Sequence, residues 1–225
     1  MTSGERIFIV GASRQGKVVL DVIRAGAIND VVGFIDDDPS RHDSLVGNVR
    51  VVGGVQYLVE NAGEHAASVA IGNNEVRRSI ATRLRRSGIA LINAIHPSAT
   101  LAPDVELGTN VLICAGAVVV TGCRLADDSV VNTGATIDHD SVLHPGAYVA
   151  PGVHTAGCVE VGELSFIGIG AILGPGVRIG ERCVIGAGSV VLSNVPSGVF
   201  ACGTPARVVR ELPPLIEWGR LLGGR

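Results

Sequence analysis

Aliphatic residues recur every six positions in the second half of the chain, from Leu101 to Val191, and Thr155 is the one break in the series. A small or β-branched residue follows each of them by four positions, as Val105 follows Leu101. A period of six is neither helical nor a plain strand alternation. It is typical of a parallel β-helix, in which each repeat forms one short flat side and the aliphatic residues stack into an interior column. The pattern predicts this coil over residues 97–206.

The residues before the coil follow a different pattern, in which apolar runs alternate with apolar residues at helical spacing. The expected strands cover residues 6–10, 31–36, 49–52, 68–71 and 90–95, and the expected helices cover residues 18–26, 56–61 and 75–86. Such alternation, with short loops that contain glycine, predicts a small Rossmann-like parallel sheet with helices on both faces, an α/β domain over residues 1–96. Residues 207–225 form a tail, in which the amphipathic stretch 208–222 is split by Pro213 and Pro214 and predicts one short helix.

The composition narrows the possible partners. Lys and Arg number 18 against 21 Asp and Glu, and the net charge of −3 gives no indication of nucleic-acid binding. No run approaches the roughly 20 apolar residues of a membrane span, and the beginning of the sequence lacks a signal-peptide pattern. The five cysteines form no C-x-x-C pair, which favours a reducing, cytoplasmic compartment.

His139 and Asp140 are the candidate catalytic pair. They follow the interior residue Ile137 near a corner of the predicted coil, so their side chains need not point inward. Proton transfer in catalysis requires a base near the reacting group, and a histidine with a carboxylate partner suits that task. The structural alternative is a solvated histidine beside a solvated aspartate.

Three loops at the carboxyl edge of the predicted sheet are candidates for nucleotide binding, because open α/β sheets hold their ligands there. The first loop ends a strand and opens a helix, which favours phosphate at the helix N-terminus. The absence of G-x-G-x-x-G argues against a dinucleotide fold. The candidate contacts in these loops are Gly11, Ser13, Asp36, Asp37, Gly72, Asn73 and Asn74.

Several motifs carry a family resemblance. They are Asn132–Asp140 (Asn-Thr-Gly-Ala-Thr-Ile-Asp-His-Asp), Phe34–Pro39, Ala70–Arg77, Asn93–Ala99 and Gly203–Arg207. Together they resemble the nucleotide-sugar acetyltransferases of the sialic acid O-acetyltransferase and bacillosamine/perosamine N-acetyltransferase family, which are hexapeptide-repeat acyltransferases. The resemblance covers essentially the whole chain.

The resemblance implies a left-handed coil, a homotrimer with active sites between adjacent subunits, and acetyl-CoA in the groove between neighbouring coils. It implies that His139 is the general base, that Asp140 orients it and that Asn132 touches the sugar. Tyr148 stands where the family often has a second histidine that contacts the acetyl group. The implied contacts of acetyl-CoA are Tyr148, Gly157, Ile169, Gly186, Ala187, Pro205 and Arg207, with Arg178, Arg182 and Arg210 as further candidates for its phosphates.

The expected function is therefore acetyl transfer from acetyl-CoA to the amine of a nucleotide-linked amino-deoxysugar, without a metal. An O-acetyltransferase acting on a sialic-acid-like sugar is a close alternative. A metal-dependent hydratase like the γ-carbonic anhydrases is a more distant one, because His139 and His144 are five residues apart, although Pro103 occupies the expected place of a third ligand. A non-catalytic nucleotide-sensing trimer is the alternative outside enzymes.

Overall fold

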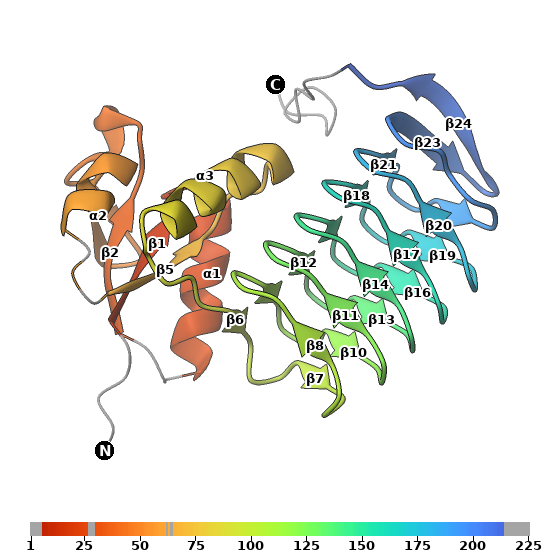
Figure 1. Ribbon diagram of the computed structural model, residues 1–225, viewed down its shortest axis with the longest axis horizontal. Helices are drawn as coiled ribbons and strands as arrows, with labels where there is room; N and C mark the ends of the chain where they lie inside the picture. Colours follow the sequence, from red (N-terminus) through yellow and green to blue (C-terminus); the bar gives the residue numbers. More distant parts are fainter. Residues whose placement is uncertain (1–5, 27–29, 62, 64, 214–225) are drawn as a thin grey trace.

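The computed structural model describes residues 6–26, 30–61, 63 and 65–213. It shows an α/β unit at one end of a long coil of short parallel strands (Figure 1). The α/β unit contains β1 (Arg6–Val10), α1 (Arg14–Gly26), β2 (Asp30–Ile35), a 3-10 turn (Pro39–Arg41), β3 (Leu45–Val46), β4 (Val49–Gly53), α2 (Val55–Asn61), β5 (Ala66–Val69) and α3 (Asn74–Arg86).

The sheet of the α/β unit has the strand order β3-β4-β2-β1-β5, and all neighbours are parallel except β3 and β4. Side chains of α1 such as Val19 and Ile23 pack with Ile7 and Ile9 on one face of the sheet. Side chains of α2 and α3, such as Leu58 and Leu84, belong to a second core on the other face. Helices therefore cover both faces, and the expected doubly wound arrangement is confirmed.

The expected closing strand over residues 90–95 is wrong in its extent. Only a bridge between Ala67 and Leu91 joins this stretch to the α/β sheet. The following residues form β6 (Ala94–Ile95), which pairs with the coil strand that begins at Leu112. The chain therefore enters the coil slightly before His96-Pro97, and α1 packs against β6.

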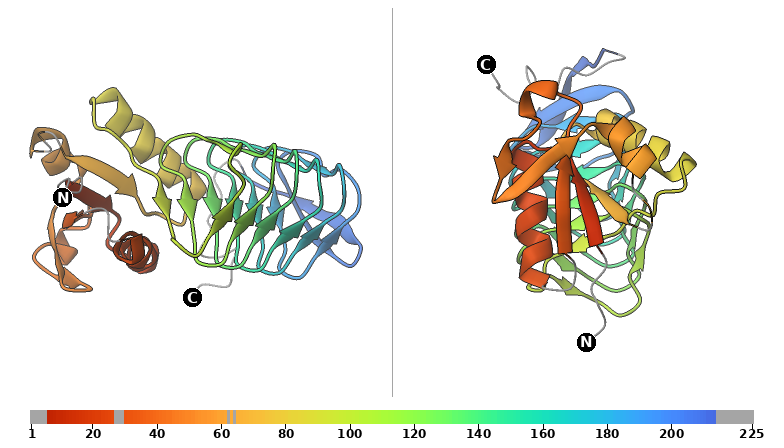
Figure 2. Two further views of the ribbon diagram at one scale, coloured as in Figure 1. Left: turned by 90° about the horizontal axis from the view of Figure 1, so that it is seen from below. Right: turned by 90° about the vertical axis from the view of Figure 1, so that its left-hand side faces the viewer.

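The coil has three flat sides, and each side is one sheet, parallel except for its last strand β24 on one side (Figure 2). Sheet one contains β6, β9 (Leu112–Ile113), β12 (Val130–Val131), β15 (Tyr148–Val149), β18 (Phe166–Ile167), β21 (Val184–Ile185), β23 (Val199–Gly203) and β24 (Ala206–Glu211). Sheet two contains β7 (Thr100–Leu101), β10 (Val118–Val119), β13 (Thr136–Ile137), β16 (His154–Thr155), β19 (Ile172–Leu173) and β22 (Val190–Val191). Sheet three contains β8 (Glu106–Leu107), β11 (Arg124–Leu125), β14 (Val142–Leu143), β17 (Glu160–Val161) and β20 (Arg178–Ile179).

Each turn of the coil takes 18 residues, since Cys183 donates a backbone hydrogen bond to Ser165 Oγ one turn earlier, at a separation of 18. The aliphatic residue of each repeat points inward: Ile137, Leu143 and Val149 are at most 1% exposed. We call the turns from sheet one to sheet two the first corner, those from sheet two to sheet three the second corner, and those from sheet three back to sheet one the third corner. The predicted interior column is confirmed.

The α/β unit is fixed to the third corner through α3. Asp128 is completely buried there and accepts hydrogen bonds from Arg78 at 3.1 Å and from Arg85 at 2.8 and 2.9 Å. Arg77 donates to the backbone carbonyls of Asp128 and Gly146, each at 2.9 Å. Burial lowers the pKa of Arg77 to about 10, so it is still charged at neutral pH.

The last described segment closes the coil with an antiparallel strand, because β24 pairs antiparallel with β23. The amphipathic stretch 208–222, which predicts one short helix, therefore begins as a strand, and residues 214–225 lie outside the described residues. Among the helices of the described residues, none has the length and the apolar character that crossing a bilayer requires.

Candidate active site

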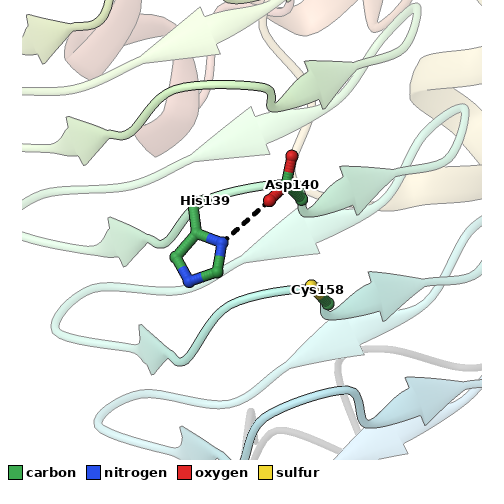
Figure 3. Close-up of side chains that lie close together, drawn as sticks. All are labelled: His139, Asp140 and Cys158. Atoms are coloured by element: carbon green, nitrogen blue, oxygen red, sulfur yellow. Dashed lines mark hydrogen bonds and ion pairs between the residues drawn. The ribbon is translucent and has the colours of Figure 1, made fainter.

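The second corner holds the predicted catalytic pair. His139 and Asp140 lie in the turn between β13 and β14, and His139 Nδ1 is 2.9 Å from Asp140 Oδ2 (Figure 3). Their side chains are 51% and 65% exposed. The imidazole is thus held by a carboxylate while it is open to a second molecule.

The pKa of His139 is raised above its ordinary value, first of all by the hydrogen bond to Asp140. The negative charge of the neighbouring Asp138 raises the same pKa further, because both carboxylates stabilise the imidazolium. A histidine in this position is a stronger base than a free imidazole. It can take a proton from a reacting group and hold it.

Neighbouring residues fix the turn that carries His139. The backbone N–H of Asp138 donates to Thr155 Oγ1 at 3.0 Å, and the backbone N–H of His139 donates to Asp138 Oδ1 at 2.7 Å. Thr155 is the break in the aliphatic column, and its buried hydroxyl lies one coil beyond the catalytic turn. The spacing alone assigns Thr155 no role, although a lone polar residue in an apolar column is the sequence signal for such a contact.

Two glycines leave room for the pair. A Cβ atom at Gly157 would lie 2.3 Å from His139 Nε2, and a Cβ atom at Gly122 would lie 2.5 Å from Asp140 Oδ1. The imidazole therefore lies directly against the backbone of the next coil. The imidazole packs against Gly157, the residue that the resemblance assigns to acetyl-CoA binding.

The other predicted coil residues lie at the first corner or beside it. Asn132 follows β12 and donates to the hydroxyl of Tyr148 at 2.7 Å. Tyr148 is only 7% exposed; its ring stacks on Phe166, with 5.0 Å between ring centroids, and Arg77 lies over it at 5.6 Å. Tyr148 therefore belongs to the contact between the coil and α3. It lies on sheet one, whereas His139 lies at the second corner, so within one chain Tyr148 does not approach the imidazole.

The predicted acetyl-CoA contacts are divided in the same way. Ile169, Gly186 and Ala187 lie at the first corner in the later coils, and Ile169 is 60% exposed. Gly157 lies at the second corner. Sheet two separates these corners, so one chain brings together His139, Asp140 and Gly157 but not the remaining contacts.

The end of the coil holds the last predicted contacts. Pro205 is exposed in the turn between β23 and β24, and Arg207 is exposed on β24. The other arginines already have partners. Arg178 pairs with Glu160 at 3.5 Å, Arg182 pairs with Glu75, and Arg210 lies over the ring of Phe200 at 5.6 Å.

In the α/β unit, the loop between β1 and α1 forms a pocket of about 370 Å³. Its lining residues are Ala12, Ser13, Arg14, Lys17 and Arg41. Asp36 supports this loop by accepting from the backbone N–H of Ala12 at 2.9 Å, and Asp37 accepts from the backbone N–H of Val55 at 2.7 Å. Ser13 is exposed at the pocket, whereas Gly11 is buried beneath it.

The loop after β5 corrects one prediction. Gly72 faces open space, and Asn73 caps α3 by accepting from two backbone N–H groups at 3.0 Å. Asn74 is completely buried, and its amide donates to the carbonyls of Leu164 and Ser165 in the coil. Asn74 therefore joins the two parts of the chain and cannot reach a nucleotide.

The structure separates the two histidines on which the metal-hydratase alternative depends. His144 lies at the third corner, and it does not share the corner of His139. Within the part of the chain that the structure describes, one group of three potential ligand side chains converges, formed by His139, Asp140 and Cys158. Sequence reasoning missed Cys158, because the sequence separates it from His139 by one full coil.

Comparison with known families gives two matches. Residues 6–84 match the PglD N-terminal domain, and residues 158–193 match the bacterial transferase hexapeptide (six repeats). A putative acetyltransferase of Staphylococcus aureus strain COL is 35% identical over 168 residues, which are 70% of this chain and 83% of that protein.

Solved structures give matches over almost the whole chain. A histidine-to-asparagine variant of perosamine N-acetyltransferase from Caulobacter crescentus, in complex with CoA and GDP-perosamine, is 36% identical with a TM-score of 0.87, and the match covers 94% of this chain and 99% of that one. The acetyltransferase domain of PglB from Neisseria gonorrhoeae, in complex with acetyl coenzyme A, is 33% identical with a TM-score of 0.86, covering 92% of this chain and 100% of that one.

Proposed function

Because the chain belongs to the hexapeptide-repeat acetyltransferases with a PglD-type N-terminal domain, and is thus an acetyl-CoA-dependent acyltransferase, we propose that it acetylates the amine of a nucleotide-linked amino-deoxysugar. The observation that carries this proposal is the exposed His139–Asp140 pair, whose 2.9 Å contact leaves one imidazole nitrogen for a substrate. The Caulobacter relative binds CoA and GDP-perosamine, a sugar nucleotide of this class.

In the proposed mechanism His139 acts as the general base. Asp140 accepts from Nδ1–H and thereby leaves Nε2 to accept the proton. The sugar amine attacks the thioester carbonyl, His139 takes a proton from the nitrogen as the adduct forms, and the CoA thiolate leaves. The raised pKa of His139 helps it to hold the proton at that stage.

The proposed nucleotide site is the pocket between β1 and α1. Arg14, Lys17 and Arg41 surround it, and α1, with 13 residues, begins there. Backbone N–H groups at a helix N-terminus and nearby cations suit the diphosphate of a sugar nucleotide. Gly72 and Asn73 at the neighbouring sheet edge are further proposed contacts, and Asn74 is excluded by its burial.

The proposed active unit is a homotrimer. Sheet two lies between the corner that holds His139 and the corner that holds Asn132 and Ile169. Its outer surface exposes Ile172 at 46%, whereas sheet three carries ion pairs such as Glu160–Arg178. If sheet two faces a threefold axis, the second corner of each subunit meets the first corner of the next. That arrangement unites the separated groups of proposed contacts in one groove, where acetyl-CoA would bind.

The test of this proposal is release of free thiol from acetyl-CoA in the presence of GDP-, UDP- or dTDP-linked amino sugars. We expect turnover with at least one of them, and we expect His139→Ala to reduce kcat by roughly 10²–10⁴-fold while the protein stays folded. Unchanged thiol release in this variant would contradict the role of His139.

Matched hydroxy sugars in the same assay test the O-acetyltransferase alternative, which predicts turnover without an amine.

We place the reaction in the cytoplasm as part of the proposal. The supporting observation is that all five cysteines are free thiols, as in proteins of reducing compartments.

A further inference from the structure

Cys158 lies beside the catalytic pair, one coil further along the second corner (Figure 3). A ring nitrogen of His139, a carboxylate oxygen of Asp140 and the sulfur of Cys158 all lie within 4.8 Å of one another. All three side chains are exposed. Three different metal-ligating groups therefore converge at a point that solvent reaches.

The backbone holds these residues in register. The N–H of Cys158 donates to the carbonyl of His139 at 2.8 Å. Asp140 and Cys158 occupy equivalent places in successive coils, and both have positive φ, 56° and 59°. The equivalent places before and after them are Gly122 and Gly176, also with positive φ. The two side chains therefore project from the second corner of the coil, next to each other.

Imidazole, carboxylate and thiolate form a ligand set that suits zinc, and the thiolate disfavours Mg²⁺ and Ca²⁺. Zinc–ligand distances of about 2.0–2.3 Å place tetrahedral ligands roughly 3.3–3.8 Å apart. Small rotations of exposed side chains suffice to reach this geometry from separations within 4.8 Å. A fourth position is left for water or an incoming ligand.

We propose that His139, Asp140 and Cys158 form a Zn²⁺ site that inhibits the enzyme, because the bound ion occupies the imidazole that must accept the proton. The binding follows from the geometry of the cluster alone. The inhibition rests on the proposed function of His139 as the base.

The first experiment measures binding on the full-length, metal-free protein, with Zn²⁺ delivered from a chromophoric chelator. We expect one Zn²⁺ per chain and an affinity at least tenfold lower in Cys158→Ser, with Cys202→Ser, a cysteine on β23, as the matched control that binds like wild type. Co²⁺ in place of Zn²⁺ should give a thiolate charge-transfer band that Cys158→Ser lacks. Equal affinity in wild type and Cys158→Ser would overturn the site.

The second experiment measures initial rates of thiol release in zinc-buffered solution. Wild type should lose activity as free Zn²⁺ rises and recover it with EDTA, whereas Cys158→Ser should be active and at least tenfold less sensitive. Equal sensitivity of the two proteins would refute the inhibitory role. Because the binding experiment needs no substrate, failure of the proposed acetyl transfer would leave its result intact and distinguishable.

Discussion

At the scale of single residues, Asp140 sets the basicity of His139. The hydrogen bond between them is the main cause of the raised pKa of His139. His139 acts as a base only when it is unprotonated, so activity should rise as the pH increases through this raised pKa. In Asp140→Asn the pKa falls toward the ordinary value of histidine, and the acid limb of the kcat/KM profile should move to lower pH.

The maximal rate of Asp140→Asn should also be lower than that of wild type, because the imidazole is a weaker base and its tautomer is less fixed. The change should be smaller than that of His139→Ala. A pH–rate profile from about pH 5 to 9 measures both effects. An acid limb that does not move would show that Asp140 does not control the titration of His139.

Gly157 gives a second test at this scale. Its Cβ would lie 2.3 Å from the imidazole, so Gly157→Ala should displace the His139 ring and reduce kcat by at least tenfold with little loss of stability. Gly174→Ala is the matched control at the same corner, because its Cβ would come no closer than 3.3 Å to the Val191 carbonyl. Thiol release and thermal unfolding of both variants measure the contrast, and equal activities would count against the predicted position of the ring.

Single residues also show what the sequence can predict about the site. His139 and Asp140 were predictable because both their spacing in the repeat and their motif point to an exposed corner. The positions of Asn74 and Tyr148 were not predictable, because their side chains make contacts between the α/β unit and the coil. Asn74 Nδ2 lies 3.0 Å from the Leu164 carbonyl, 90 residues away in the sequence. No local pattern encodes such a pairing.

At the scale of elements, α3 holds the α/β unit on the coil through the buried carboxylate of Asp128. Arg78 and Arg85 both depend on it for hydrogen bonds, and they are only 28% and 26% exposed. In Asp128→Asn the two guanidinium groups lose their buried charged partner and keep only the more exposed carboxylates of Glu163 and Asp127. We expect a loss of about 3 kcal/mol in the free energy of unfolding, measured by urea denaturation.

The control for this prediction is Glu163→Gln. Glu163 pairs with Arg78 at 3.0 Å but is 41% exposed, so its replacement should cost less than about 1 kcal/mol. Hydrogen exchange of α3 should accelerate in Asp128→Asn and stay near wild type in Glu163→Gln. Equal costs in the two variants would contradict the special role of the buried carboxylate.

The elements themselves were largely predictable, because a period of six and a helical period each leave a clear apolar signature. The wrong assignments of strands and helices occur where the neighbouring strand with which a segment pairs decides its structure. Residues 90–95 have the composition of a sheet strand, yet Ala94 and Ile95 pair with Leu112 and Ile113 in the coil. Residues 208–211 begin the stretch 208–222 in which one short helix is expected, yet they belong to β24 because they pair with the edge of β23.

At the scale of the whole molecule, the proposed trimer predicts that two inactive variants restore activity when they assemble together. A site formed within one chain would not allow this. His139→Ala disables the second corner, and Ile169→Trp should block acetyl-CoA at the first corner. Each variant alone should be inactive. In each mixed trimer from co-expression, one of the three sites combines an intact second corner with an intact first corner, so about a third of wild-type activity should return.

Differently tagged copies allow the mixed trimers to be purified, and size-exclusion chromatography with light scattering confirms that both variants assemble. Absence of any recovered activity in mixed trimers would show that each site lies within one chain. In the proposed trimer the two groups of contacts come from different chains, and the spacing of residues within one chain does not encode such a meeting.

The antiparallel strand at the far end of the coil limits growth of the protein into fibres. A stack of parallel strands offers free N–H and C=O groups at its last turn, and a further molecule could extend it by the same pairing. Here β24 runs in the opposite direction along the end of sheet one. Its exposed Arg207, Arg210 and Glu211 place charges along the outermost edge, and such charges discourage the addition of another strand. On sheet one, the repetition that builds the coil therefore ends at a charged antiparallel strand.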